Sequence, residues 1–148
     1  MRIVIVLLTA ILLTAILLTG CAMPTPAPTP TPAPSFVDAY EALDAPYLAL
    51  NEQMNAIAFN DPDWRAETVR LAQEWRQAID ALRDMPQPEG AQWAEAWPVL
   101  QAGLDEYALA AGAIENAAAQ NQPALMEPAR AHVIEGVNLV SEALRLLQ

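Results

Sequence analysis

WAEAWPVLQAGLDEYALAAGAIENAA, residues 93–118, sets the fold class of this 148-residue chain. Its apolar side chains recur at steps of three and four from Trp93 to Ile114. This spacing places them along one face of an α-helix, and the run Asn121–Pro123 ends the pattern. We therefore predict a helix over residues 90–119.

Three further segments carry the same helical spacing. They predict helices over residues 36–59, 62–85 and 123–147. Ser35 and Asp38 form an N-cap signature at the first of these. Asp61 is a good N-cap for the second, with Pro62 at the first helical position. The first two of these segments therefore have their own start signals.

Long helices joined by connections of a few residues predict an all-α fold. The short connections favour an up-down-up-down antiparallel four-helix bundle. Apolar spacing close to 3.5 residues favours left-handed packing of the helices. No segment of the sequence shows the alternation that is typical of a strand.

Three prolines fall inside the predicted helices. The apolar phase continues through Pro46 and Pro98 without a slip, so we predict kinked but continuous helices at both positions. Pro128 leaves two readings of the last helix open. Either the helix begins near residue 123, or it begins at Pro128 after a short turn at residues 123–126.

The first 35 residues have a different character. Residues 1–20 combine Arg2 with a charge-free apolar run, which is the pattern of a secretory signal peptide. Residues 21–35 are rich in proline, threonine and alanine and predict an extended stalk of polyproline type. We expect the folded domain to occupy residues 36–148.

The end of the apolar run, Leu18-Thr19-Gly20-Cys21, resembles the lipobox of bacterial lipoprotein precursors. The resemblance implies that residues 1–20 are removed and that Cys21 carries acyl chains such as palmitate. It also implies a lipid-anchored, extracytoplasmic protein of the bacterial cell envelope, at the outer membrane or the cell surface. The alternative is an uncleaved membrane anchor. The remainder, with its turn over residues 82–90, resembles small helical-bundle lipoproteins of unassigned function.

The charge and the rare residues exclude several classes of function. Eighteen acidic residues against seven arginines and no lysine give a net charge of −11, which argues against nucleic-acid binding. One cysteine and one histidine, His132, are too few for a typical zinc site or c-type haem attachment. We therefore predict no enzyme, no catalytic residue, no metal and no cofactor. A metal- or haem-dependent bundle is the distant alternative.

Five aromatic residues are predicted to share one level of the bundle with Pro46 and Pro98. They are Tyr40, Tyr47, Trp75, Trp93 and Trp97. Splayed helices lined by these rings could hold a small apolar or aromatic ligand, for which we expect a cavity of roughly 300 Å³ or more. Alternatively, the rings fill the space that the kinks create.

These observations predict a membrane-anchored, non-enzymatic binding or interaction module. Its expected partners are the membrane, through Cys21, and an envelope protein or a small apolar ligand. One form of this hypothesis is ligand capture among the aromatic residues. The other is docking of a protein on an exposed apolar patch, expected on the helix over residues 123–147.

Overall fold

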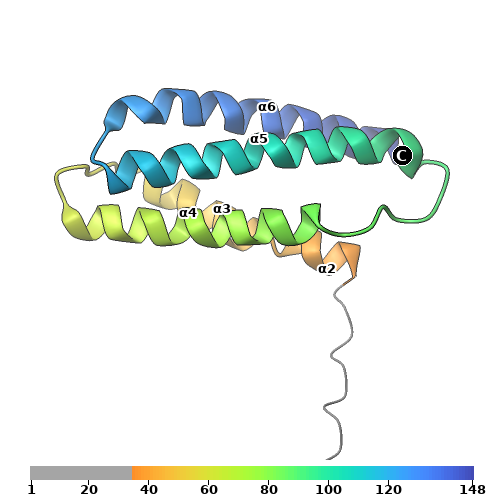
Figure 1. Ribbon diagram of the computed structural model, residues 1–148, viewed down its shortest axis with the longest axis horizontal. Coiled ribbons are helices and arrows are strands. Elements are labelled where there is room, and N and C mark those ends of the chain that lie inside the picture. Colours follow the sequence, from red (N-terminus) through yellow and green to blue (C-terminus); the bar gives the residue numbers. More distant parts are fainter. Residues whose placement is uncertain (1–34) are drawn as a thin grey trace, which may run out of the picture. The chain divides into compact units, whose positions relative to one another are not determined.

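The computed structural model describes residues 35–148 (Figure 1). The predicted signal peptide over residues 1–20, the lipobox with Cys21, and the stalk up to residue 34 lie outside the described residues. Ser35 is the first residue of the described part. Its side chain accepts a hydrogen bond from the Asp38 backbone N–H, while its own N–H donates to the Asp38 carboxylate, so the predicted N-cap is a complete capping box.

Helices and connecting turns make up the whole of residues 35–148, and no strand occurs among them. In chain order the elements are α2 (Phe36–Glu41), α3 (Asp44–Met54), α4 (Pro62–Arg83), α5 (Trp93–Ala119), the short 3₁₀ helix η1 (Pro123–Leu125) and α6 (Met126–Leu146). The prediction of an all-α fold is confirmed.

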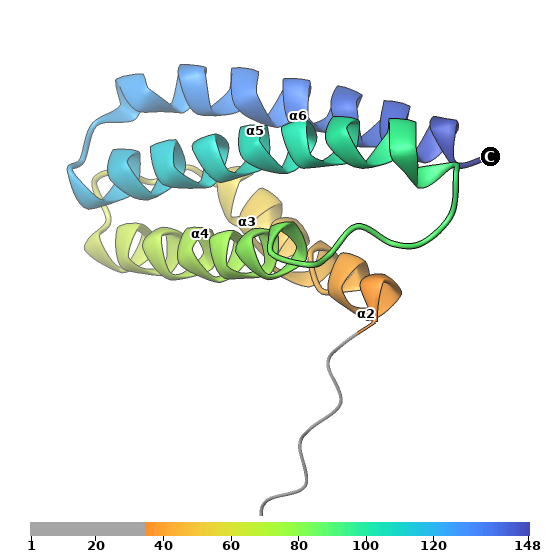
Figure 2. The same cartoon turned by 45° about the vertical axis from the view of Figure 1, so that its right-hand side comes forward.

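The long helices pack against one another through their apolar faces. α4 contacts both α3 and α5, and α5 contacts α6. In both views α5 and α6 lie side by side along most of their length (Figures 1 and 2). Trp75, Ile79, Leu82, Leu100 and Leu104 are the largest apolar side chains that are fully buried. Within α4 and within α5, these side chains recur at steps of three and four residues.

The predicted helix over residues 36–59 is wrong in one respect, because it is two helices, α2 and α3, with a turn at Ala42 and Leu43. Pro46 explains the interruption. It has no N–H to donate to the Ala42 carbonyl, and its ring would clash with the preceding turn. The break makes Pro46 the third residue of α3, where a backbone N–H has no helical partner. α3 then ends at Met54, short of residue 59.

The other two prolines are accommodated differently. Pro128 is the third residue of α6, which begins at Met126. The short turn predicted before this helix is present as η1, and the helix starts two residues before Pro128. Pro98 lies inside α5, and α5 is continuous through it, as predicted. α5 begins at Trp93 because Gly90, with a φ of 123°, ends the preceding connection in a conformation that a helix cannot contain.

α5 and α6 approach each other closely at two glycines. A Cβ atom added to Gly136 would collide with the ring of Tyr107. A Cβ atom added to Gly103 would lie 2.9 Å from Val140 Cγ2 and 3.1 Å from the Val140 backbone nitrogen. The absence of side chains at these positions therefore sets the short distance between the two helices.

Candidate functional site

The five predicted aromatic residues divide into two neighbouring groups. Trp93 and Trp97 pack with Phe36, and their ring centroids lie 4.9 Å and 6.2 Å from that of Phe36. Tyr40 joins this group, 6.2 Å from Phe36. The second group contains Tyr47, Trp75 and Tyr107, with centroid separations of 5.3 to 6.4 Å. Phe36 and Tyr107 therefore belong to these two groups, although the sequence analysis did not include them.

The space between the two groups is small. Tyr40, Tyr47 and Trp75 line a common cavity with Tyr107 and Val140, and its volume is about 90 Å³. Trp93 and Trp97 do not line it. Small-molecule sites usually occupy roughly 300 to 1,000 Å³, so this cavity holds at most a few ordered waters.

A larger opening lies between α3 and α6. No Cα atom of α3 comes within 8 Å of a Cα atom of α6, although both helices border the same core. The aromatic cavity lies along this seam, and a cleft of about 530 Å³ lies where η1 meets α6. We call this the α3/α6 cleft. Its lining residues are Asn51, Met54, Asn55, Ile57, Ile114, Met126, Glu127, Ala129, Arg130 and Val133.

The α3/α6 cleft has an apolar floor. Met54, Ile114 and Val133 also line an adjoining cavity of about 60 Å³ that reaches Trp75. Ile57, at the end of the cleft, is 56% exposed, which is high for so apolar a side chain. The cleft therefore offers apolar surface that nothing among the described residues covers.

Four polar side chains complete the lining of the α3/α6 cleft: Asn51, Asn55, Glu127 and Arg130. Arg130 is exposed and differs from every other arginine in residues 35–148, because it forms neither an ion pair nor a hydrogen bond there. The remaining arginines of this part are bonded to carboxylates or, for Arg65, to the Phe59 carbonyl oxygen. One cation is thus available at the cleft.

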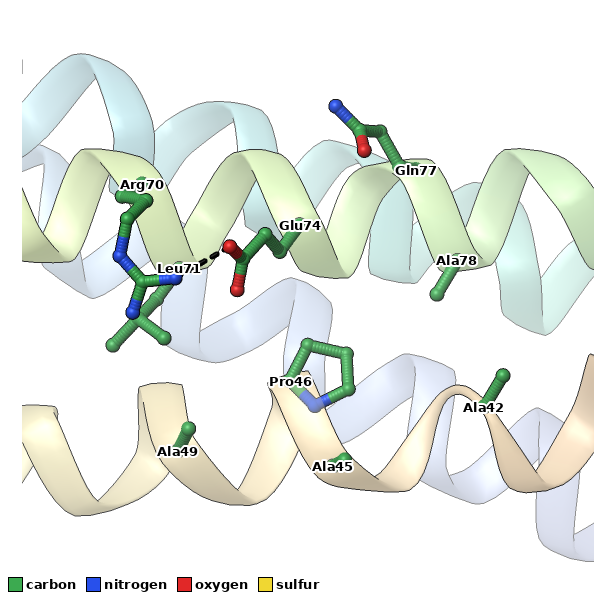
Figure 3. Close-up of a pocket in the computed structure, with 9 residues that line it drawn as sticks. All are labelled: Ala42, Ala45, Pro46, Ala49, Arg70, Leu71, Glu74, Gln77 and Ala78. Carbon is green, nitrogen blue, oxygen red and sulfur yellow. Dashed lines mark hydrogen bonds and ion pairs between the residues drawn. The ribbon is translucent and has the colours of Figure 1, made fainter.

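A second groove, of about 570 Å³, lies between α3 and α4 (Figure 3). Its floor is formed by Leu71 and small residues beside Pro46. The charged side chains at its edge, Arg70 and Glu74, are bonded to each other, and Gln77 points away from the groove (Figure 3). With its charges already paired, this groove lacks a polar group that could orient a ligand.

Burial changes the acidity of two tyrosines beside the α3/α6 seam. It raises the pKa of Tyr107 to about 12, with smaller contributions from Tyr47, Tyr40 and Asp44. Burial also raises the pKa of Tyr40, aided by the negative charge of Asp44. Both phenols therefore stay neutral over the physiological range.

His132 lies between α5 and α6, away from the lining of the α3/α6 cleft. Its Nδ1 atom is 2.6 Å from Glu106 Oε2, and both side chains are partly exposed. This contact gives the histidine a structural partner across the helix pair. Among the described residues, no group of three or more His, Cys, Asp or Glu side chains is arranged to hold a metal ion.

The sequence analysis did not predict the α3/α6 cleft. The available signal was two methionines and an arginine on facing helices, since methionine is common at adaptable binding surfaces.

Comparisons with known proteins add no assignment: no family model, no curated protein and no solved structure matches this chain. None of the helices between residues 35 and 148 combines the length and the apolar character that a membrane span requires.

Proposed function

We propose that the protein is a lipid-anchored, non-enzymatic binding module of the bacterial cell envelope that takes up a small apolar ligand in the α3/α6 cleft. The observation that carries the proposal is the cleft of about 530 Å³, with its apolar floor and few polar groups. Volume and composition both fall within the usual range of small-molecule sites. In this proposal the aromatic residues have a structural role: they pack against one another along the α3/α6 seam and do not bind the ligand.

The proposal includes an up-down-up-down, left-handed bundle. Contacts between α4 and α5 support the antiparallel order, because Gln73 bonds to Glu115 whereas Arg83, further along α4, bonds to Asp105, earlier in α5. In this topology α3 and α6 are neighbours at the edge of the bundle. Among the described helices, α3 and α6 are then the adjacent pair without any Cα atoms within 8 Å of each other.

Delivery to the envelope rests on the sequence. The lipobox resemblance at Leu18–Cys21 supports lipidation of Cys21 and an extracytoplasmic location. Multiple acyl chains on one residue would provide stable anchoring. Substitution Cys21→Ser is expected to move the protein from the membrane fraction to the soluble fraction in cells that cleave the signal. Continued membrane association of the cleaved Cys21→Ser protein would contradict lipid anchoring.

Ligand uptake is tested with a neutral fluorescent probe, N-phenyl-1-naphthylamine. The protein is the mature chain over residues 21–148 with Cys21→Ser, which has no lipid of its own to bind the probe. We expect saturable fluorescence enhancement that Val133→Phe abolishes, because the larger ring occupies the cleft. Leu109→Phe is the matched control, since Leu109 lies on α5, is 54% exposed and lines none of these cavities. Equal enhancement in wild type and Val133→Phe would remove the cleft from the proposal.

A second candidate function is docking of an envelope protein on α6. Ile134 and Val137 are exposed by 53% and 40%, and Leu144 by 37%. These side chains form part of the α6 surface that α5 does not cover. Introducing a photocrosslinking residue at Ile134 tests this function in cells. A discrete crosslinked partner would favour it, and crosslinks with no preferred product would count against it.

A further inference from the structure

The α3/α6 cleft combines an apolar interior with one available cation. Its interior continues into the cavity of about 60 Å³ beside Trp75, so the apolar surface is elongated rather than round. Met54 and Val133 line both spaces. An unbranched chain fits such a surface better than a compact ring system does, because it can follow the seam between the two helices.

The polar side chains in the cleft lining favour a negatively charged group. Arg130 offers a planar fork of N–H donors that matches a carboxylate, and no side chain in residues 35–148 uses it. Asn51 on α3 and Asn55 directly after α3 add amide donors. Glu127 adds a negative charge to the same lining, which limits the charge that the site can balance. A monoanion suits this arrangement better than a dianion such as a phosphate monoester.

The rest of the protein strengthens this argument. Eighteen acidic residues repel anions over most of the surface. Among the described residues the other arginines are already bonded, so Arg130 is the one place where an anion gains an unused partner. Resting on the proposed function, we propose that the α3/α6 cleft binds a long-chain monocarboxylic acid, with its carboxylate at Arg130 and its chain along Met54 and Val133.

The experiment compares two ligands of equal chain length, dodecanoate and 1-dodecanol, near pH 7, where the acid is ionised. Binding to the mature chain over residues 21–148 with Cys21→Ser is measured by isothermal titration calorimetry. Charge-assisted hydrogen bonds predict an affinity for dodecanoate that is about 10- to 100-fold higher than for the alcohol. Arg130→Gln is expected to remove most of this difference and to leave the affinity for the alcohol unchanged.

Arg145→Gln is the matched control, because Arg145 lies on the same helix but pairs with Glu142 and lines none of the cavities along the seam. It should leave both affinities unchanged. Circular dichroism melting checks that each variant is folded. Equal affinity of wild type and Arg130→Gln for dodecanoate would overturn the carboxylate assignment while leaving apolar binding intact. If wild type binds neither of these two compounds and also does not bind N-phenyl-1-naphthylamine, the proposed function is overturned as well.

Discussion

The two sides of α6 differ sharply in how closely another helix approaches. On one side, Gly103 and Gly136 let the α5 and α6 backbones come so near that a methyl group at either glycine has no room. On the other side, no Cα atom of α3 lies within 8 Å of α6. One helix thus takes part in the tightest contact and in the open seam.

Side-chain size explains the difference. Gly136 on α6 and Gly103 on α5 have no side chain to hold the two backbones apart. The seam with α3 carries Tyr47, Met54 and other long side chains that fill only part of the gap. Small residues therefore close a helix pair, whereas long side chains facing each other across a seam leave cavities.

Gly136→Val should have the largest effect on stability. Its added carbons collide with Tyr107, and overpacking of this kind destabilises by about 1–3 kcal/mol. Urea denaturation measures the change in the free energy of unfolding. Gly112→Ala is the control, because no atom beyond the neighbouring turns of its own helix lies within 4 Å of the added Cβ, and it should stabilise by about 0.5–1 kcal/mol. Unchanged stability of Gly136→Val would mean that α5 and α6 are further apart than described.

Val133→Phe tests the open side of the same helix. The cleft has room for the ring, so filling it should stabilise the protein by up to about 1–2 kcal/mol instead of destabilising it. Urea denaturation under the conditions used for Gly136→Val allows a direct comparison. A loss of stability similar to that of Gly136→Val would show that the seam is closed in solution.

High pH should destabilise the folded protein through Tyr107, which lies beside the α3/α6 seam. Burial raises the pKa of Tyr107 to about 12 from its ordinary value of 10.0, so the folded state disfavours its ionised form. The stability linked to Tyr107 is fully present below pH 10 and is lost as the pH rises from 10 to 12. Tyr107→Phe should flatten this alkaline loss, measured by thermal melting and by tyrosinate absorbance. Parallel losses in both proteins would place Tyr107 in a more solvated environment.

The smallest effect on stability is expected for an ion pair between α4 and α5. Arg76 on α4 and Glu115 on α5 form an ion pair of 3.0 Å, with exposed fractions of 45% and 20%. Arg76→Gln should destabilise by about 0.2–1 kcal/mol, because exposed pairs contribute little. The difference should shrink in high salt. A loss that is large and independent of salt would contradict this surface role.

The sequence predicted the helices well because burial follows the apolar stripes. It missed the break between α2 and α3 for a specific reason. Leu43 lies in the turn yet is only 6% exposed, so the apolar spacing continues through a position where the helix stops. Pro46 was the local signal for this break, but the apolar periodicity on both sides of it favoured one continuous helix. Proline three positions into a helix indicates a start as readily as a kink.

The α3/α6 cleft was harder to predict than the helices. A stripe shows which face of a helix is buried, but it does not give the distance between two helices that are far apart in sequence. Arg130 illustrates the same limit, since its lack of a partner depends on where α3 and η1 place their side chains. The aromatic residues were conspicuous in the sequence, but large rings also fill space well.

The break at Ala42 and Leu43 also has a mechanical consequence. Ser35 leads directly into α2 and α3, and α3 supplies one wall of the α3/α6 cleft. Tension applied at the N-terminal end of the described part would therefore load this wall before it reached α4, α5 or α6. A turn of two residues between the short helices can yield while the closely packed α5/α6 pair stays intact. The N-terminal end of the described part is thus coupled by the chain itself to the α3/α6 seam.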